Sequence, residues 1–497
     1  MTTTASRPAF TSEAPKLGLV GGFDGIRGIG VGMVLVGHAL FTWVESWVTI
    51  VDTFFVLSGF LITTLLLQEH RSTGQIGLRK FYARRAVRLL PSVWLFCAVW
   101  IVIGVIGTVL HIEAISLTGI LEDAGAAVAY VYHLFFPNGL YMIEPNTQSN
   151  RYMWHLWTLS VEEWFYFVIP ATVLVCIRRN WVKPLGWVLG IGFVTIGLAR
   201  YLAYTGFFQD DTHMVAGVRL ALLQRPDALM LGCLVAIINA HLTADRIERL
   251  RRPLLVAGSV GLVVWLVMLN LSSGFIEKLG GPYFPYLPDG PKQFNRADML
   301  STMYWFRFGH TLGALAFACI LMCLVHRRDW WLSRTWSWGP FQWMGRLSYT
   351  LYVWHALPYV FIIALTGGEN ASIGVQVIRT PVLIAAAFAV SLPVYYLVEL
   401  RVLRMKLRFS AESEALDLRT GKMVQVRDGK IHDGPVHDGP AAAGAAGGAG
   451  AGVQGAGSPS TSGSPSGPAP QPAPSEPAQG PGLDDAPDTS GASSTES

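Results

Sequence analysis

Long apolar segments dominate this chain, and they restrict it to a membrane-spanning architecture. Hydrophobic residues make up 52% of the 497 residues and charged residues only 14%, against roughly 25% charged residues in soluble domains. A helix needs about 20 mainly apolar residues to cross the hydrocarbon core of a bilayer. Segments of this length recur from Ile26 to Leu397. We therefore predict an all-α fold, a polytopic integral membrane helix bundle.

Clusters of Lys and Arg predict how the chain is threaded, because cytoplasmic loops carry an excess of these residues. The clusters lie at 71–88, 178–183, 246–252, 326–328 and 401–408. All of them face the cytoplasm only if the short apolar segment 117–137 does not cross, so we expect this segment to be partly buried or re-entrant on the outer side. This threading gives about ten transmembrane helices in the plasma membrane, with both termini cytoplasmic. The expected spans are Ile26–Val44, Ile50–Gln68, Pro91–Leu110, Leu156–Ile177, Leu185–Tyr204, Val218–Ala240, Leu254–Leu271, Tyr304–Val325, Leu347–Leu365 and Val377–Leu397.

Composition divides the chain into three parts. We expect an N-terminal cytoplasmic segment at 1–22, the transmembrane domain at 23–405 and a cytoplasmic tail rich in Gly, Ala, Ser and Pro at 406–497. After residue 440 the only large aliphatic residues are Val453 and Leu483, so the tail cannot bury a core and is predicted to be disordered. The net charge is only +4, and nucleic-acid binding is not indicated.

The first span contains ionisable residues that a membrane interior disfavours. Arg27 and His38 are eleven residues apart, so on a helix they share one face about 16 Å apart along the axis. Asp24 lies near the same face. Intramembrane ionisable groups are costly and usually functional. The stripe indicates a charged entrance followed by a proton-handling imidazole, and the alternative is a histidine that a neighbouring helix satisfies.

Two polar groups stand out in the next spans. Asp52 opens the second span shortly before Ser58, in a segment whose small residues let helices approach closely. Arg85 and Arg88 are three residues apart and share a helical face. Such a pair can hold a phosphate, or it can anchor the helix at the lipid headgroups.

Later spans add two acids and a second histidine. Glu162 and Glu163 lie about two turns into one span, and Tyr166 follows Glu162 by four residues and therefore shares its face. Acids inside hydrocarbon require a partner, which favours a role for at least one of them. His355 places a second imidazole inside the ninth expected span.

Six motifs occur in order along these spans. They are D-G-I-R-G with R-x10-H from Arg27 to His38, V-D-T-F-F-V-L-S-G-F-L-I at 51–62, R-x-x-R with L-L-P at 85–91, W-T-L-S-V-E-E-W-F-Y at 157–166, Q-R-P-D-A-L-M-L-G at 224–232 and G-R-L-S-Y-T-L-Y-V-W-H at 345–355. Together they resemble those of the membrane-bound acyltransferase 3 family of O-acyltransferases, over about residues 20–405. The resemblance implies a ten-helix core, acyl-CoA from the cytoplasm as donor substrate, and an acceptor hydroxyl, often on a sugar of a cell-surface glycan.

The resemblance also implies roles for single residues. His38 becomes the catalytic base, because a neutral imidazole can take the proton of an attacking alcohol. Glu162 or Asp52 is expected to orient its ring. Substrate-site positions by the same resemblance are Asp24, Arg27, Asp52, Ser58, Arg85, Arg88, Tyr166, Arg225 and His355, with the arginines at 27, 85 and 88 near the donor's phosphates. For Arg225, which forms an R-x-D element with Asp227, a salt bridge between spans is as strongly expected as a substrate contact.

No metal and no permanently bound cofactor are expected. Many relatives carry a fused extracytoplasmic esterase-like domain that completes the transfer, whereas this chain continues into low complexity after the spans. We therefore expect the membrane core to complete the transfer alone or with a separate partner protein. The compositional bias of the tail is typical of a bacterium with a high-GC genome.

The sequence thus predicts an integral-membrane O-acyltransferase that moves an acetyl or other short acyl group from acyl-CoA to a hydroxyl of a carbohydrate or a hydroxylated small molecule. Its partners would be the lipid bilayer, the donor and the acceptor. Two alternatives belong to other classes. A multi-pass transporter or flippase could use the same buried charges, although the chain shows no internal repeat of spans. An inactive scaffold would act through its tail instead of His38.

Overall fold

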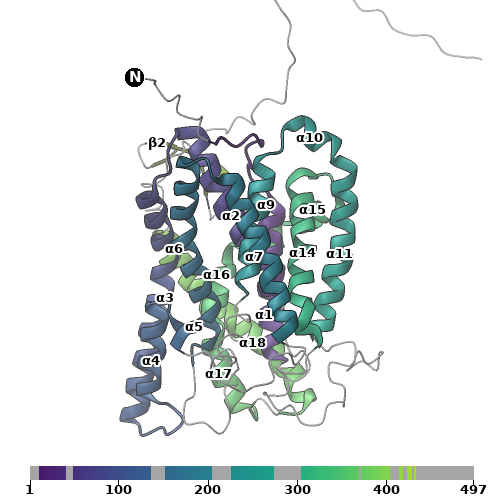
Figure 1. Cartoon of the computed structure of the whole chain (residues 1–497). Helices are drawn as coiled ribbons and strands as arrows, with labels where there is room; N and C mark the ends of the chain where they lie inside the picture. The colour runs from purple at the N-terminus through teal and green to yellow at the C-terminus, as the bar shows by residue number, and fades with distance from the viewer. Residues whose placement is uncertain are drawn as a thin grey trace, which may run out of the picture. The chain divides into compact units, whose positions relative to one another are not determined.

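The computed structural model of the chain describes residues 10–40, 47, 49–135, 152–203, 225–273, 304–368, 371–402, 414–417, 422–427 and 430–432. Up to residue 402 this described part is a bundle of helices without strands, which confirms the all-α prediction (Figure 1). The helices are α1 (Gly21–Ala39), α2 (Thr49–Thr73), α3 (Leu78–Val109), α4 (Leu117–Val128), α5 (Tyr132–Phe135), η2 (Trp154–Leu156), α6 (Trp157–Arg178), α7 (Val182–Ala203), α9 (Pro226–Ala240), α10 (Ala244–Arg249), α11 (Arg251–Ser273), α14 (Tyr304–His326), α15 (Trp331–Trp336), α16 (Gly339–Trp354), α17 (Ala356–Leu365), α18 (Ile373–Pro393) and the π-helical η3 (Val394–Glu399).

Seven helices of the described part are long and apolar enough to cross a membrane, or eight if the bent pair α16 and α17 is one span. Two further expected spans coincide with α1, whose polar residues lower its hydropathy, and α9, which has only 15 residues. The structure therefore supports a multi-pass membrane protein, and the count of ten stays a prediction. The parts of expected spans at 41–44 and 218–224 lie outside the described residues.

The described residues of the segment 117–137 form two short helices, α4 and α5, neither of which is long enough to cross a bilayer. Ser116 caps α4 by accepting a hydrogen bond from the backbone N–H of Gly119 at 3.2 Å. In Figure 1, α4 lies beside the lower end of α3, and α5 lies next to α6. This arrangement agrees with a segment that does not cross, while the membrane side on which it lies stays a prediction.

Glycines bring α1 and α16 into close contact. A Cβ added to Gly345 would stand 1.8 Å from the carbonyl oxygen of Asp24, and one added to Gly28 would stand 2.1 Å from that of Phe341. Both distances are far below any van der Waals contact, so only glycine permits this backbone approach. The close packing sets the end of α1 against the end of α16, where two histidines lie.

Apolar side chains cover the outside of the bundle. On α7, four exposed residues at intervals of three and four positions form one stripe, and they are Trp187, Ile191, Val194 and Leu198. A soluble helix turns such a stripe towards a core, but these side chains are between 55% and 74% exposed. The outward apolar stripe is what contact with lipid requires.

Beyond the helices, three short strands form an antiparallel sheet in the order β1–β2–β3. They are β1 (Glu414–Asp417), β2 (Lys422–Arg427) and β3 (Lys430–His432). The sequence analysis placed these residues in the disordered tail and did not predict them. Local signals were present, because Met423, Val424 and Val426 favour a strand and Asp428-Gly429 is a typical hairpin connection. Residues 437–497, the second unit of the chain, lie outside the described part.

Candidate active site inside the helix bundle

Two histidines from distant parts of the sequence meet at the ends of α1 and α16. Nδ1 of His38 lies 2.9 Å from Nε2 of His355. Their rings are stacked, with centroids 5.1 Å apart and an interplanar angle of 22°. His355 is 1% exposed, whereas His38 is only half-buried. The structure therefore joins two residues that the sequence analysis predicted separately, and we call them the histidine pair.

A break between α16 and α17 fixes the proton positions in His355. The two helices meet at an angle of 56°, and Pro358 explains the break because it has no N–H for the carbonyl of Trp354. Nδ1 of His355 lies 2.7 Å from the carbonyl oxygen of Tyr352 and 3.2 Å from that of Leu351. A carbonyl can only accept a hydrogen bond, so Nδ1 carries the proton. In the neutral ring, Nε2 is then an acceptor.

This tautomer determines the state of His38. Because Nε2 of His355 accepts, Nδ1 of His38 must donate the hydrogen bond between them. The second nitrogen of a neutral His38, Nε2, therefore carries the lone pair. His38 is also the member of the pair that keeps accessible surface. The geometry thus gives the half-buried imidazole a fixed orientation and a basic nitrogen that bonds to none of the residues the structure describes.

The turn η2 supplies aromatic neighbours that sequence reasoning did not select. The ring of Trp154 contacts His38 edge-on at 4.9 Å between centroids, and His155 contacts His355 at 5.2 Å. Nε2 of His155 lies 3.1 Å from the carbonyl oxygen of Val353. A third imidazole next to the pair could have been suspected, because His155 directly precedes the segment that carries Glu162.

The two acids of α6 have separate partners. Oε1 of Glu162 accepts hydrogen bonds from the hydroxyls of Ser58 and Tyr166. Glu163 forms a two-pronged ion pair with Arg85, whose Nε lies 2.9 Å from Oε1 and 3.1 Å from Oε2. The guanidinium of Arg85 also lies 3.1 Å from the centre of the Tyr166 ring. This packing brings Ser58, Glu162, Tyr166 and Arg85 together, as residues of one site.

The expectation that Glu162 or Asp52 orients His38 does not fit this geometry. Glu162 is held by two hydroxyls, and Asp52 bonds to other residues deep in the bundle. Within the described residues the ring nitrogen next to His38 belongs to His355. The sequence could not reveal this partner, because the two histidines are 317 positions apart.

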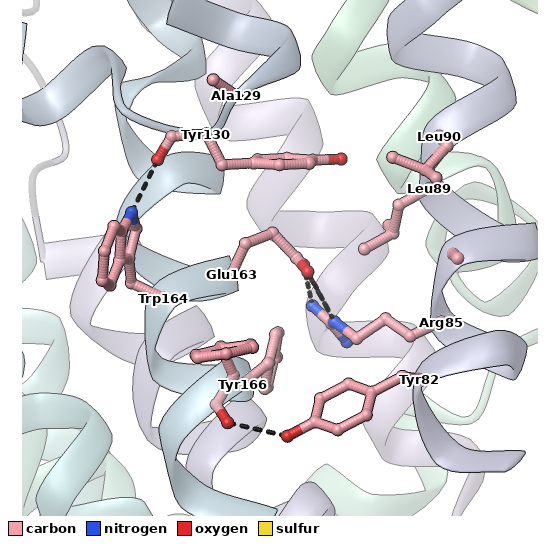
Figure 2. Close-up of a pocket in the computed structure, with 11 residues that line it drawn as sticks. Tyr82, Arg85, Leu89, Leu90, Ala129, Tyr130, Glu163, Trp164 and Tyr166 are labelled. Carbon is pink, nitrogen blue, oxygen red and sulfur yellow. Dashed lines mark hydrogen bonds and ion pairs between the residues drawn. The ribbon is translucent and has the colours of Figure 1, made fainter. Parts of the chain in front are cut away.

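Arg85 and Glu163 border a cavity of about 400 Å³ between α3, α6 and the connection from α4 to α5. Figure 2 shows their ion pair between Tyr130 on one side and Tyr82 on the other. The wall is mostly aromatic and aliphatic. Trp164 closes one edge by donating its indole N–H to the carbonyl of Tyr130 at 3.0 Å. The ion pair of Arg85 and Glu163 is therefore a polar group in the wall of a mainly apolar cavity.

Three predicted arginines lie near one another but differ in their partners. Arg27 is bonded to Asp24 at 3.0 Å, and Arg85 is bonded to Glu163. Arg88 interacts electrostatically with both other arginines, and its side chain is exposed even though groups of several helices surround it. In the described part of the chain, Arg88 makes no hydrogen bond or ion pair of its own. It is the arginine best placed to receive an anion.

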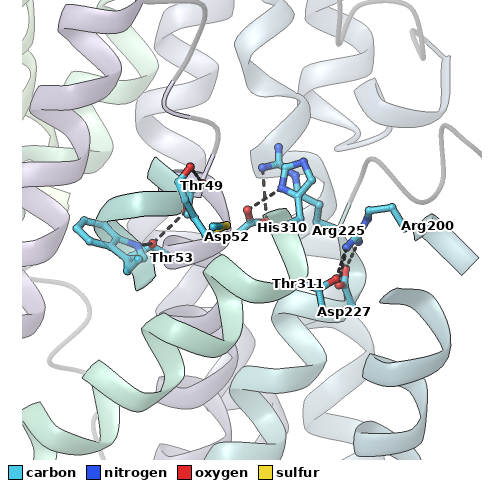
Figure 3. Close-up of polar contacts among 10 residues, drawn as sticks. Thr49, Asp52, Thr53, Arg200, Arg225, Asp227, His310 and Thr311 are labelled. Carbon is cyan, nitrogen blue, oxygen red and sulfur yellow. Dashed lines mark hydrogen bonds and ion pairs between the residues drawn. The ribbon is translucent and has the colours of Figure 1, made fainter. Parts of the chain in front are cut away.

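Asp52 and Arg225 lie in a separate cluster, which Figure 3 shows and which we call the buried ion network. Asp52 is 2.7 Å from Nδ1 of His310 and 3.6 Å from Arg225. Arg200 binds both carboxylate oxygens of Asp227, with the Nη1 to Oδ2 distance at 3.0 Å. Its five members, from α2, α7, α14 and the start of α9, are at most 4% exposed. The network favours the salt bridge between spans as the role of the R-x-D element.

Arg200 and His310 were missed by the sequence analysis, although the rule that selected His38 also applies to them, since both lie inside apolar spans. Arg225 precedes α9 in the left-handed backbone region, at φ 54°. Non-glycine residues adopt this conformation at a cost, which the ion pair with Asp52 helps to offset. Among the described residues, no group of His, Cys, Asp or Glu side chains is placed to hold a metal ion.

These features define the class of protein. It is a multi-pass membrane protein with a polar, enzyme-like site inside its helix bundle. A family model described as an acyltransferase domain matches residues 20–399. The match covers most of the chain, and the chain belongs to this acyltransferase 3 family. The resemblance predicted from the six motifs is thereby confirmed, and membership favours an enzyme over a transporter.

Two curated relatives that this chain is similar to are named O-acetyltransferases. The peptidoglycan O-acetyltransferase OatA of Listeria monocytogenes is 28% identical over 340 residues, which cover 67% of this chain and 48% of the relative. The O-acetyltransferase OatA of Staphylococcus aureus is 27% identical over 354 residues, covering 69% of this chain and 51% of the relative. The chain therefore spans about half the length of these curated relatives. No solved structure matches it significantly.

Proposed function

We propose that this protein is an integral-membrane O-acyltransferase of the plasma membrane. It would transfer an acetyl or other short acyl group from acyl-CoA to a hydroxyl of a carbohydrate, on a cell-surface glycan or a glycolipid. Family membership supports acyl transfer, and the relatives named O-acetyltransferases support a hydroxyl acceptor. The acyl-CoA donor, the carbohydrate acceptor and cytoplasmic termini are the parts of this proposal that need direct tests.

The observation that carries the proposal is the orientation of the histidine pair. His38 Nε2 acts as general base and removes the proton of the acceptor hydroxyl as its oxygen attacks the thioester carbon. The resulting imidazolium keeps its Nδ1–H hydrogen bond to His355. When the carbon–sulfur bond breaks, His38 returns the proton to the leaving thiolate. Proton transfer by a positioned imidazole contributes about 10²- to 10⁴-fold to rate.

The arginines support a phosphorylated donor. Asp24 neutralises Arg27, and Glu163 neutralises Arg85. These two arginines would therefore shape the entrance to the donor site, while Arg88 supplies the available positive charge. A guanidinium binds phosphate oxygens through paired N–H groups. Phosphates of acyl-CoA at Arg88 would leave the thioester to extend along α1 towards His38, which follows Arg27 by three helical turns.

The acid in the middle of the site has a positioning role in this scheme. Glu162 fixes the hydroxyl of Tyr166, and the ring of Tyr166 in turn carries the guanidinium of Arg85. Ser58 adds a second hydrogen bond to the same carboxylate oxygen. We therefore assign Glu162 to the support of the donor site, and Asp52 and Arg225 to the stability of the bundle. In this scheme the membrane core completes the transfer alone or with a separate partner protein.

The test is a coupled assay on the purified full chain in proteoliposomes. Radiolabelled acetyl-CoA is supplied with glycan fragments that carry free hydroxyls, and both the released CoA thiol and the labelled glycan are measured. The proposal predicts the two products in equal amounts. Thiol release without labelled glycan would show hydrolysis only, and the absence of both with acetyl-CoA would contradict the donor assignment.

A further inference from the structure

A fourth arginine approaches the same region from α16. Arg346 lies one helical turn before Thr350, so the two side chains share a face. The hydroxyl of Thr350 donates a hydrogen bond to the carboxylate of Glu399 at the end of η3. One residue before Thr350, Tyr349 donates its hydroxyl to the carbonyl of Leu89 at 2.7 Å. These contacts fasten α16 to α3 next to Arg88 and to η3 at Glu399.

Charges of three elements therefore face one another around Tyr395, on η3. Tyr395 interacts electrostatically with Glu399, Arg346 and Arg88, and Arg88 interacts with Glu399 as well. Like Arg88, Arg346 makes no hydrogen bond or ion pair with the residues that the structure describes. Near Tyr395, two guanidiniums that bond to none of the described residues thus accompany a single carboxylate, Glu399, which leaves one positive charge in excess.

Glu399 is an unusual residue for this position. It is 5% exposed, and burying a carboxylate is costly unless hydrogen bonds and charges compensate it. It also ends a π-helical turn, a rare conformation that is frequent at functional sites. Thr350 and Arg88 compensate its charge without a direct ion pair. The carboxylate is therefore close enough to weaken an anion's attraction to Arg88 but does not occupy the guanidinium.

The residues of the site follow or precede three of the basic clusters along the chain. Arg88 is the last residue of the cluster at 71–88, Arg346 follows 326–328, and Glu399 precedes 401–408. A polyanion would be attracted by the positive charge of these clusters. The field of the loops would raise the local concentration of such a ligand.

We propose that Arg88 and Arg346 together form a binding site for a phosphate ester, and that Glu399 is a built-in counter-anion that keeps binding reversible. The two arginines contact the phosphate oxygens, and Glu399 repels the phosphate and promotes its release. The proposal rests on the proposed function only in naming acyl-CoA as one source of the phosphate. The other source is a lipid phosphate, such as that of a polyprenyl-linked sugar.

The test measures binding without any acyl transfer, so it stands or falls independently of the enzyme activity. The full chain in lipid nanodiscs is titrated with adenosine 3′,5′-bisphosphate, the phosphorylated part of CoA. Arg346→Gln should weaken binding by about tenfold or more, because it removes a charge-assisted contact. Glu399→Gln keeps the acceptor for Thr350 but removes the charge, and it should tighten binding severalfold. Arg334→Gln, at an exposed arginine of α15 outside the basic clusters, is the matched control and should bind like the native chain.

A second arm repeats the titration in nanodiscs that contain a polyprenyl phosphate. If this lipid competes with the nucleotide in the native chain and loses that ability in Arg346→Gln, the site takes the lipid phosphate; without competition, it takes the nucleotide. The proposal is overturned if Arg346→Gln binds both probes like the native chain, or if Glu399→Gln weakens binding. A melting curve of each variant shows whether a loss of binding reflects a loss of folding.

Discussion

The histidine pair and the buried ion network are both polar clusters inside an apolar bundle, but they differ in what they leave accessible. Every member of the network is at most 4% exposed, and its two carboxylates face two guanidiniums. In the histidine pair, only His355 is buried to this degree, and His38 is half-buried. The network is sealed and balanced in charge, whereas the pair is open on one side.

This difference teaches how to separate structural from chemical polar residues in a membrane. The free-energy cost of burial alone does not distinguish them, because burying any ionisable group in hydrocarbon is unfavourable. A group that stabilises the bundle has its charge compensated and its surface removed. A group that reacts must keep one atom available to a substrate, as we propose for His38. The following predictions test that distinction, beginning with the largest effect.

The largest expected effect is a loss of stability when a charge of the buried ion network is removed. Asp227→Leu leaves the guanidinium of Arg200 buried without its carboxylate, and breaking a buried pair in this way costs about 3–5 kcal/mol. We expect a large fall in the unfolding temperature in detergent. The double variant Arg200→Leu with Asp227→Leu removes both charges and should recover most of the loss. A double variant as unstable as the single one would show that the pair is not a structural unit.

In the histidine pair, by contrast, we expect a substitution to lower the transfer rate without lowering the unfolding temperature. His355→Leu removes the acceptor that orients His38, and we expect the transfer rate to fall by about 10²-fold. His355→Gln offers an amide oxygen in place of Nε2 and should retain part of the activity. The readouts are kcat with labelled acetyl-CoA and the unfolding temperature. Equal activity of the Leu and Gln variants would contradict the orienting role.

A smaller effect is expected at the edge of the site. Ser58→Ala removes one of two hydroxyls that bond to Glu162, while Tyr166 still bonds to the same oxygen. One such hydrogen bond contributes about 1 kcal/mol, so KM for the donor should rise by less than about tenfold. Tyr166→Phe, which also disturbs the support of Arg85, should raise it more. The reverse order would place Ser58, not Tyr166, at the donor site.

The smallest effect is predicted outside the membrane. The hydrogen bond from Arg327 lowers the pKa of Asp329 below its usual range; Asp329 is solvent-exposed and Arg327 is half-buried. A carboxyl group with a lowered folded-state pKa stabilises the protein above its ordinary pKa and loses that contribution as the pH falls through the lowered value. Screening by solvent makes such pairs weak. Asp329→Asn should therefore leave both activity and the unfolding temperature at pH 7 unchanged, and a clear loss of either would contradict this assignment.

The sequence predicted what depends on neighbouring residues. Hydropathy located the spans, the segment 117–137 was too short to cross, and the four-residue spacing placed Tyr166 next to Glu162. Arg200 and His310 followed the same rule as His38 and were overlooked. What depends on distant helices could not be predicted. The bond between His38 and His355, the salt bridge from Arg225 to Asp52 and the position of Glu399 arise only when helices that are distant in the sequence pack together.

The central claim is that His38 supplies the base while other buried histidines do not. The most direct test measures acetyl transfer from labelled acetyl-CoA in membrane vesicles with His38→Ala and with His241→Ala, a half-buried histidine outside the site. The account predicts a loss of about 10²- to 10⁴-fold for His38→Ala, native activity for His241→Ala, and native unfolding temperatures for both. Full activity of His38→Ala would contradict the account and remove the histidine pair from the chemistry.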